Sequence, residues 1–263
     1  MKLRNLTKLV AAMTLVLGAS AAQASTIDFD ITINFNSGLS ASQQAVFTQA
    51  EQFWETNILG YNPAEGINFT TGLTISAGGS AIDGAGGVLG QAGPSLAYTG
   101  STNGLYYSST GQMNFDSADL TAMENNGSLY NVILHEMAHV IGFGTLWELN
   151  NLYSSGSGLY TGANALAAYQ AEFSGGATSI PVELDGGAGT ANAHWDESWL
   201  GGTADIMTGY LEGAVTISNT TLAAFEDLGY IVSNASQVED VSAPIAFGGL
   251  LALSMLGFRQ RKV

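Results

Sequence analysis

The sequence contains no cysteine, and its six basic residues all lie within the first eight or the last five positions. The absence of cysteine excludes disulfide frameworks, thiolate metal sites and thiol nucleophiles. All 22 acidic residues fall between Asp28 and Asp240, where there is no Lys or Arg, so this body carries about −22, against −16 for the whole chain. Such a body repels nucleic acid and anionic lipid. We expect no nucleic-acid partner.

The carboxylates themselves have two interpretations. Solubility explains most surface acids without any ligand. Binding of Ca²⁺ by an acidic loop is the alternative, although no loop pattern in the chain supports it.

The first residues have the pattern of a secretory signal peptide. Three basic residues in the first eight positions precede the apolar run Leu9–Gly18, and Ala22-Gln23-Ala24 supplies a small-residue cleavage site. Residues 1–24 are therefore predicted to be a signal peptide that is removed on export.

The last residues have three parts: Val241-Ser242-Ala243-Pro244, the uncharged segment Ile245–Phe258 and a basic end, Arg259–Val263. As a helix, 14 residues span about 21 Å, less than the roughly 30 Å of bilayer hydrocarbon. We nevertheless predict a short membrane segment over 245–258 with its basic end in the cytoplasm, because of its position and that cluster.

This tail, residues 241–263, resembles the bacterial PEP-CTERM sorting signals, with Val-Ser-Ala-Pro in place of Pro-Glu-Pro. The resemblance implies an exosortase-type membrane enzyme as a partner. It also implies a location on the outer face of the inner membrane before processing, and at the cell surface or outside the cell afterwards.

Residues 25–240 remain as one predicted domain. Alternating apolar residues predict a half-buried strand over Ile27–Phe35, and a helix is predicted from Ser40 or Ser42 to about Ile58. A second strand is predicted over Ile67–Ala77. The stretch Gly78–Gly111 is rich in Gly, Ser and Ala, and we expect loops and short edge strands there.

Further along, Met113–Asp116 is expected to be an edge strand, followed by a short helix over 117–124. Helices are also predicted over Ala163–Phe173 and Thr221–Leu228. Residues 150–161 and 175–190 are expected to be loops.

The pattern that carries most chemistry is His135-Glu136-Met137-Ala138-His139. On a helix beginning after Ser128 and ending at Gly142, two histidines four residues apart lie on one face. Both imidazoles can then reach one zinc ion. A glutamate directly after the first histidine can act as a general base toward a water molecule.

A catalytic zinc site generally has three protein ligands and one open position. Only three histidines occur in the chain, and the remaining one, His194, is the favoured third ligand. Glu148, Asp196 and Glu197 are the alternatives.

The pattern His-Glu-x-x-His-x-x-Gly, a delayed third histidine and a later methionine resembles the metzincin clan of zinc proteases. The long interval between Gly142-Phe143 and His194-Trp195 is similar to the leishmanolysin family. The resemblance implies that His135, His139 and His194 bind one Zn²⁺. It further implies that Glu136 is the catalytic base and then acid, and that Met207 forms a structural turn beneath the metal. Tyr210 is a candidate for stabilising the oxyanion, although packing is its favoured role.

The fold expected from this resemblance is α+β and metzincin-like. A twisted N-terminal sheet carries a backing helix and the active-site helix, and a loop-rich C-terminal subdomain ends in one helix. The expected function is that of an exported zinc endopeptidase acting on protein or peptide substrates. The alternative is a catalytically inactive, protease-like surface or matrix protein that serves adhesion.

Overall fold

The computed structural model describes residues 29–62, 72–99, 104–210 and 215–233. The predicted signal peptide, residues 1–24, and the predicted sorting tail, residues 241–263, lie outside these residues. Within the described ranges, none of the helices has the length and apolar character needed to cross a bilayer. The membrane segment predicted over 245–258 falls outside those ranges.

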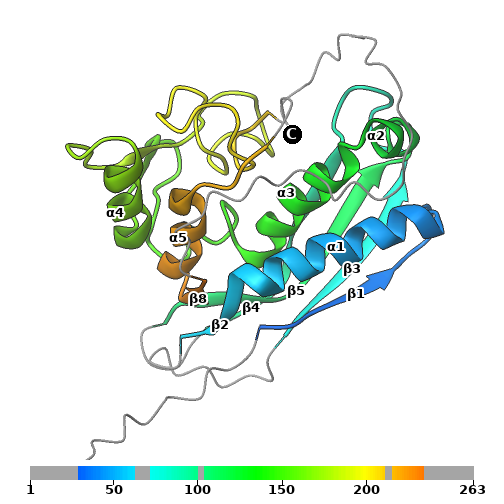
Figure 1. Ribbon diagram of the computed structural model, residues 1–263, viewed down its shortest axis with the longest axis horizontal. Helices are drawn as coiled ribbons and strands as arrows, with labels where there is room; N and C mark the ends of the chain where they lie inside the picture. Colours follow the sequence, from blue (N-terminus) through cyan, green and yellow to red (C-terminus); the bar gives the residue numbers. More distant parts are fainter. Residues whose placement is uncertain (1–28, 63–71, 100–103, 211–214, 234–263) are drawn as a thin grey trace, which may run out of the picture.

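A four-stranded mixed sheet supports the site. Its order is β1 (Ile31–Phe35), β3 (Leu73–Ser80), β5 (Tyr106–Asp116) and β4 (Gly90–Thr99). The first three strands are parallel, and β4 runs antiparallel to β5 at the edge. Helices α1 (Ala41–Asn57) and α3 (Leu129–Ile141) lie together over one face of this sheet (Figure 1).

Helix α1 begins where the sequence predicts it. The Ser40 hydroxyl accepts a hydrogen bond from the Gln43 amide (3.2 Å), and the Gln43 side chain accepts one from the Ser40 amide (2.9 Å). This capping box satisfies two amides that the first turn leaves without partners. The buried face of the helix includes Phe47 and Trp54, and the Trp54 indole donates to the Leu134 carbonyl of α3 at 3.2 Å.

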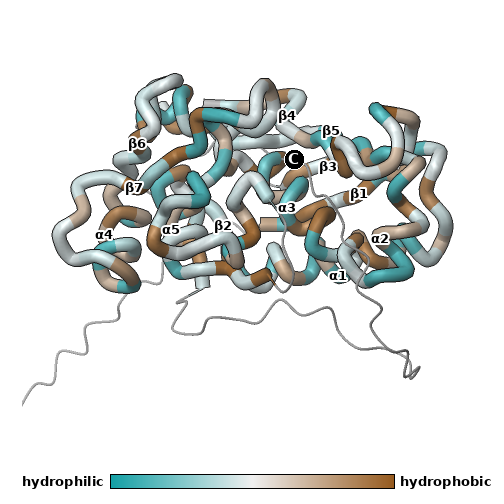
Figure 2. The backbone as a smooth tube through the Cα atoms, turned by 90° about the horizontal axis from the view of Figure 1, so that it is seen from above, coloured by the Kyte–Doolittle hydropathy of each residue, from teal (hydrophilic) through white to brown (hydrophobic). Residues whose placement is uncertain are grey.

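Helix α3 lies in the middle of the described chain, between α1 and the β4 edge (Figure 2). Twelve of its thirteen residues are buried, including the polar side chains of the histidine motif. Gly142 ends the helix with φ 140°, a backbone angle that glycine adopts without strain. On β5, a Cβ atom at Gly111 would overlap the Val140 side chain, so this glycine allows close packing of helix and sheet.

The remaining elements are short. They are α2 (Leu120–Asn126), α4 (Ala163–Glu172) and α5 (Asn219–Asp227), a β2–β8 pair (Ile58–Tyr61 and Tyr230–Val232) and a β6–β7 pair (Leu159–Tyr160 and Ile180–Pro181). The described residues therefore combine a mixed sheet with five helices, which is compatible with a leishmanolysin-type fold.

Two carboxylates cap the packed helices α4 and α5 reciprocally. Glu172, at the end of α4, accepts hydrogen bonds from the Asn219 and Thr220 amides at the start of α5 (both 2.8 Å). Asp227, at the end of α5, accepts from the Asn164 and Ala165 amides of α4 (2.7 and 3.0 Å). Each helix N-terminus thus receives a negative charge, which its dipole favours.

The expectation of loops and short edge strands over Gly78–Gly111 is right only in part, because residues 81–89 form a loop and β4 lies at the sheet edge, but β4 has 10 residues and β5 is a central strand. Strands β4 and β5 cover much of this stretch, and β5 lies between β3 and β4, so Met113–Asp116 is not an edge strand. The glycines and serines lower the strand signal of the sequence, whereas the fold requires small residues where α3 packs closely. Strand pairing in the sheet overrides the weak local preference.

Several predicted boundaries also move. Strand β3 begins at Leu73, and the first part of the strand predicted over Ile67–Ala77 lies outside the described residues. Phe35, at the end of β1, is 37% exposed. The short helix α2 begins at Leu120 rather than Ser117. Each of the two predicted loops, 150–161 and 175–190, contributes one strand of the β6–β7 pair.

Replacing Asp227 with alanine should lower the free energy of unfolding by about 1–3 kcal/mol, because two helix amides and the Tyr160 hydroxyl lose their acceptor. Urea denaturation followed by circular dichroism measures this change. Asp30→Ala, at an exposed aspartate, is the control and should stay within about 0.5 kcal/mol of the parent. Equal effects of the two substitutions would contradict the capping role.

Candidate metal centre and cleft

The structure brings the three histidines of the chain together. His135 and His139 lie one turn apart on α3, and His194 comes from the segment that follows β7. The Nε2 atoms of the three rings lie 3.1 Å (His135–His139), 2.9 Å (His139–His194) and 3.0 Å (His135–His194) apart. This is a group that could hold a metal ion.

The other ring nitrogens define the protonation of the cluster. The Nδ1 atoms of His135, His139 and His194 face the carbonyl oxygens of Ile206 (2.6 Å), Phe143 (2.9 Å) and Thr190 (2.8 Å). A carbonyl only accepts hydrogen bonds, so each Nδ1 carries a proton, and in a neutral ring the Nε2 then presents a lone pair. The short Nε2–Nε2 separations therefore do not represent hydrogen bonds.

Burial reinforces the neutral state. It lowers the pKa of His135 to about 3, with a further contribution from His139, and it lowers the pKa of His139 to about 4. Three neutral imidazoles with converging lone pairs are suited to a cation. Zn–N bonds of about 2.0–2.1 Å in a tetrahedral site place ligand nitrogens roughly 3.3 Å apart, which is close to the observed spacing. The donor set fits zinc.

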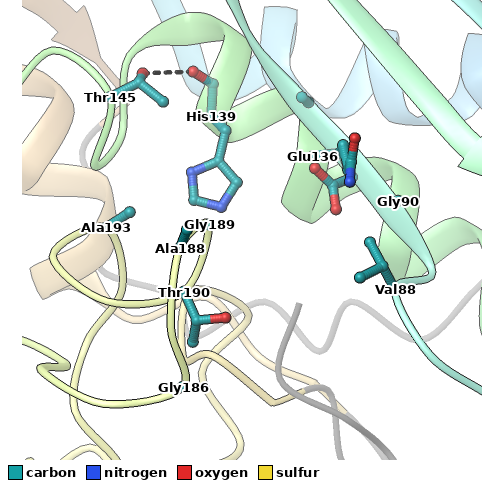
Figure 3. Close-up of a pocket in the computed structure, with 12 residues that line it drawn as sticks. Val88, Gly90, Glu136, His139, Thr145, Gly186, Ala188, Gly189, Thr190 and Ala193 are labelled. Carbon is teal, nitrogen blue, oxygen red and sulfur yellow. Dashed lines mark hydrogen bonds between the residues drawn. The ribbon is translucent and has the colours of Figure 1, made fainter. Parts of the chain in front are cut away.

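Two backbone turns hold the rings. The Thr145 hydroxyl donates to the His139 carbonyl at 2.7 Å (Figure 3). Gly144 has φ 71°, and a Cβ atom there would overlap the Ala193 carbonyl. The chain leaving α3 therefore passes directly against the segment that carries His194, which requires glycine for both its backbone angle and its lack of a side chain.

The second turn contains Met207, which is fully buried. Its amide donates to the Asp205 carboxylate (2.8 Å), and its carbonyl accepts from the Trp195 amide (3.0 Å). The preceding residue, Ile206, supplies the carbonyl that orients His135. This turn thus connects two of the three histidine segments.

Glu136 lies beside the histidines in an open cavity of about 440 Å³. The cavity is lined by Gly90, Gln91 and Ala92 of the β4 edge, by Glu136 and His139, and by loop 186–193 (Figure 3). Glu136 is 1% exposed, and burial raises its pKa to about 8. Its Oε1 atom is buried without a hydrogen-bond partner in the described part of the chain.

The alternative third ligands lie elsewhere. Glu148 is exposed and accepts a hydrogen bond from the Ser155 amide at 2.6 Å. Asp196 and Glu197 form a separate group with Glu183, in which carboxylate oxygens lie within 4.8 Å of one another. Glu183 of this group is buried, but three grouped carboxylates alone do not establish an ion, so Ca²⁺ binding stays a prediction.

Tyr210 is half-buried, and its backbone carbonyl accepts the Thr208 hydroxyl at 2.9 Å. This contact involves only the backbone of Tyr210, so a catalytic role of the phenol stays a prediction.

Sequence reasoning missed the contribution of β4 to the cavity. A strand running from Gly90 to Thr99 has little of the alternating apolar pattern that would have revealed it.

Comparison with known proteins identifies relatives. The family model for leishmanolysin, a peptidase family, matches residues 105–244. A leishmanolysin homolog from Crithidia fasciculata is 28% identical over 144 residues, covering 49% of this chain and 21% of that protein. The matched part thus spans about a fifth of the relative's length. The family match includes all three histidines, Glu136 and Met207.

The unusual state of Glu136 has a measurable consequence in metal-free protein. Its pKa in the folded chain lies above its ordinary value of 4.5, so the folded state binds more protons between these values. Its contribution to stability is complete below pH 4.5 and is lost as the pH rises through about 8. Glutamine does not ionise, so the Glu136→Gln variant does not lose stability in this way as the pH rises.

Chelator-treated Glu136→Gln protein should therefore gain stability over the parent between about pH 5 and about pH 8. Thermal melts at both pH values measure the difference. Glu148→Gln, at the exposed glutamate, should show no comparable gain. A stability difference between Glu136→Gln and parent that is the same at both pH values would contradict the raised pKa.

Proposed function

This chain belongs to the leishmanolysin family of peptidases, and on that premise we propose that it is an exported zinc-dependent endopeptidase. The observation that carries the proposal is the cluster of three neutral histidines whose Nε2 atoms lie within 3.1 Å of one another. A buried glutamate borders the same open cavity. A complete ligand set, a base and room for a peptide are what metal-dependent hydrolysis requires.

We assign His135, His139 and His194 as the ligands of one Zn²⁺ and Met207 as the turn beneath them. When bound, zinc supplies Lewis-acid chemistry: it makes a water molecule acidic enough to react near neutral pH and polarises the substrate carbonyl. The carbonyl oxygens of Ile206, Phe143 and Thr190 hold the rings in one tautomer, which keeps the ligand nitrogens aimed at a common point.

Glu136 is the proton carrier in this proposal. As general base it takes a proton from the attacking water, and as general acid it delivers that proton to the leaving amine. Its side chain is 1% exposed and lies against Gly90 of β4, at the wall of the cavity. Packing is the favoured role of Tyr210, and donation to the oxyanion is the alternative role.

The proposed location follows from the ends of the chain. The signal-like pattern over 1–24 supports export, and the tail over 241–263 supports temporary attachment to the outer face of the inner membrane before processing by an exosortase-type enzyme. The protein would then act at the cell surface or outside the cell. Its substrates would be proteins or peptides.

The activity is tested on casein with purified chain, with and without zinc. We expect hydrolysis that disappears on chelation and returns with Zn²⁺. Glu136→Gln should lower kcat by about 10²–10⁴-fold, because the proton carrier is lost. Glu148→Gln is the matched control and should retain parental turnover.

The adhesion alternative makes the opposite prediction. If the zinc-containing parent is inert on casein and on a peptide library, and Glu136→Gln changes no measurable property, the peptidase proposal is wrong.

The ligand assignment has a separate test. His194→Ala should lower zinc affinity by at least 10-fold, since a three-ligand site becomes a two-ligand one. Zinc content after dialysis and competition with a chromogenic chelator measure it. Asp196→Ala is the neighbouring control. If His194→Ala binds zinc as tightly as the parent and Asp196→Ala binds it more weakly, the third ligand is the Asp196 carboxylate and not His194.

A further inference from the structure

Gly90 is the first residue of β4 and is paired with Phe115 of β5. It is buried. Its φ lies outside the left-handed region in which glycine is favoured, so any L-residue could adopt this backbone. Glycine also has an entropic cost here, because it loses more conformational freedom on folding than other residues. The backbone alone gives no reason for glycine here.

The reason lies on the facing helix. A Cβ atom added at Gly90 would lie 3.0 Å from Oε1, 3.1 Å from Cγ and 3.2 Å from Cδ of Glu136. All three nearest atoms belong to this one side chain. The carboxyl group of Glu136 therefore occupies the space that a side chain at position 90 would fill.

Two other glycines of these strands show that the contact is specific. At Gly111 a Cβ atom would overlap Val140, one helical turn beyond Glu136 on the same face of α3. There the missing side chain permits the packing of helix on sheet. At Gly93, in contrast, a Cβ atom would meet only the Thr145 methyl at 3.9 Å, an ordinary van der Waals distance.

We propose that Gly90 is a positioning residue: its lack of a side chain fixes where the Glu136 carboxyl lies along the wall of the cleft. This inference rests on the proposed peptidase function, in which that carboxyl carries the proton. At 3.0 Å the carboxyl must move by a few tenths of an ångström to admit a methyl group. A displacement of about 1 Å at a reacting group can cost about 100-fold in rate.

The activity test compares three variants with the parent. Gly90→Ala should lower kcat about tenfold and leave KM within about twofold, with zinc content unchanged because the three atoms nearest to the added Cβ belong to Glu136 and not to a histidine. Gly90→Val, with two further methyl groups, should lower kcat at least 100-fold. Gly93→Ala, on the same strand, should retain parental kcat and KM. Parental kcat in Gly90→Ala would overturn the proposal.

A second test needs no activity and uses chelator-treated protein. Where no atom is crowded, Gly→Ala stabilises a chain by restricting its unfolded state, which corresponds to a rise of about 1–4 °C in Tm for a domain of this size. We expect this rise for Gly90→Ala in a Glu136→Ala background, where the crowding atoms are removed. In the Glu136 parent, the rise should be absent or reversed.

This double-mutant cycle separates the positioning role from a general packing role. A Tm change for Gly90→Ala that is equal in both backgrounds would overturn the inferred contact. Gly93→Ala should give the same Tm change in both. If the zinc-containing parent is inert, the proposed function fails, while the cycle still decides whether Gly90 and Glu136 are coupled.

Discussion

The constraint on which the structure depends is the convergence of three imidazole lone pairs. Nε2 atoms of His135, His139 and His194 lie 2.9–3.1 Å apart, although neutral nitrogens without an intervening proton repel one another. Each ring is held by a hydrogen bond from Nδ1 to a backbone carbonyl. The three carbonyls come from the end of α3, from the loop before His194 and from the Met207 turn. The fold therefore brings together segments far apart in the sequence, and a cation at their meeting point would satisfy all of them.

The scarcity of basic residues gives the site its electrostatic character. No Lys or Arg occurs between residues 9 and 258, so carboxylates there have backbone amides and hydroxyls as partners. Asp116 accepts hydrogen bonds from four backbone amides, which hold its pKa below the usual range. Asp227 and Glu172 cap helices. Glu136, like Asp119, has one oxygen that is buried without a hydrogen-bond partner in the described chain. Burial raises the pKa of Glu136, and its carboxyl borders the cavity beside the histidines, where the proton transfer is proposed.

The sequence predicted the grouping of the three histidines better than the architecture of the sheet. Helix α3 and its histidine spacing are local features, readable from a 3.6-residue period, and Ser40 marked the start of α1 through its capping box. Strand β4 was missed because its stability comes from pairing with β5, a tertiary effect with little local signal. The role of Gly90 depends on a contact with α3 that no spacing encodes. The position of His194 beside α3 was expected, because it is the one histidine outside the helix motif and because of the family resemblance. The carbonyl oxygens that accept hydrogen bonds from the Nδ1 atoms could not be read from the sequence and are seen only in the structure.

The central claim is that this histidine cluster is the zinc site of a peptidase. X-ray absorption at the zinc K-edge of purified, zinc-containing protein tests it most directly. The account predicts three nitrogen ligands at about 2.0–2.1 Å, with imidazole multiple scattering that diminishes by about one third in His194→Ala. A first shell composed only of carboxylate oxygens, or a spectrum unchanged in that variant, would contradict it.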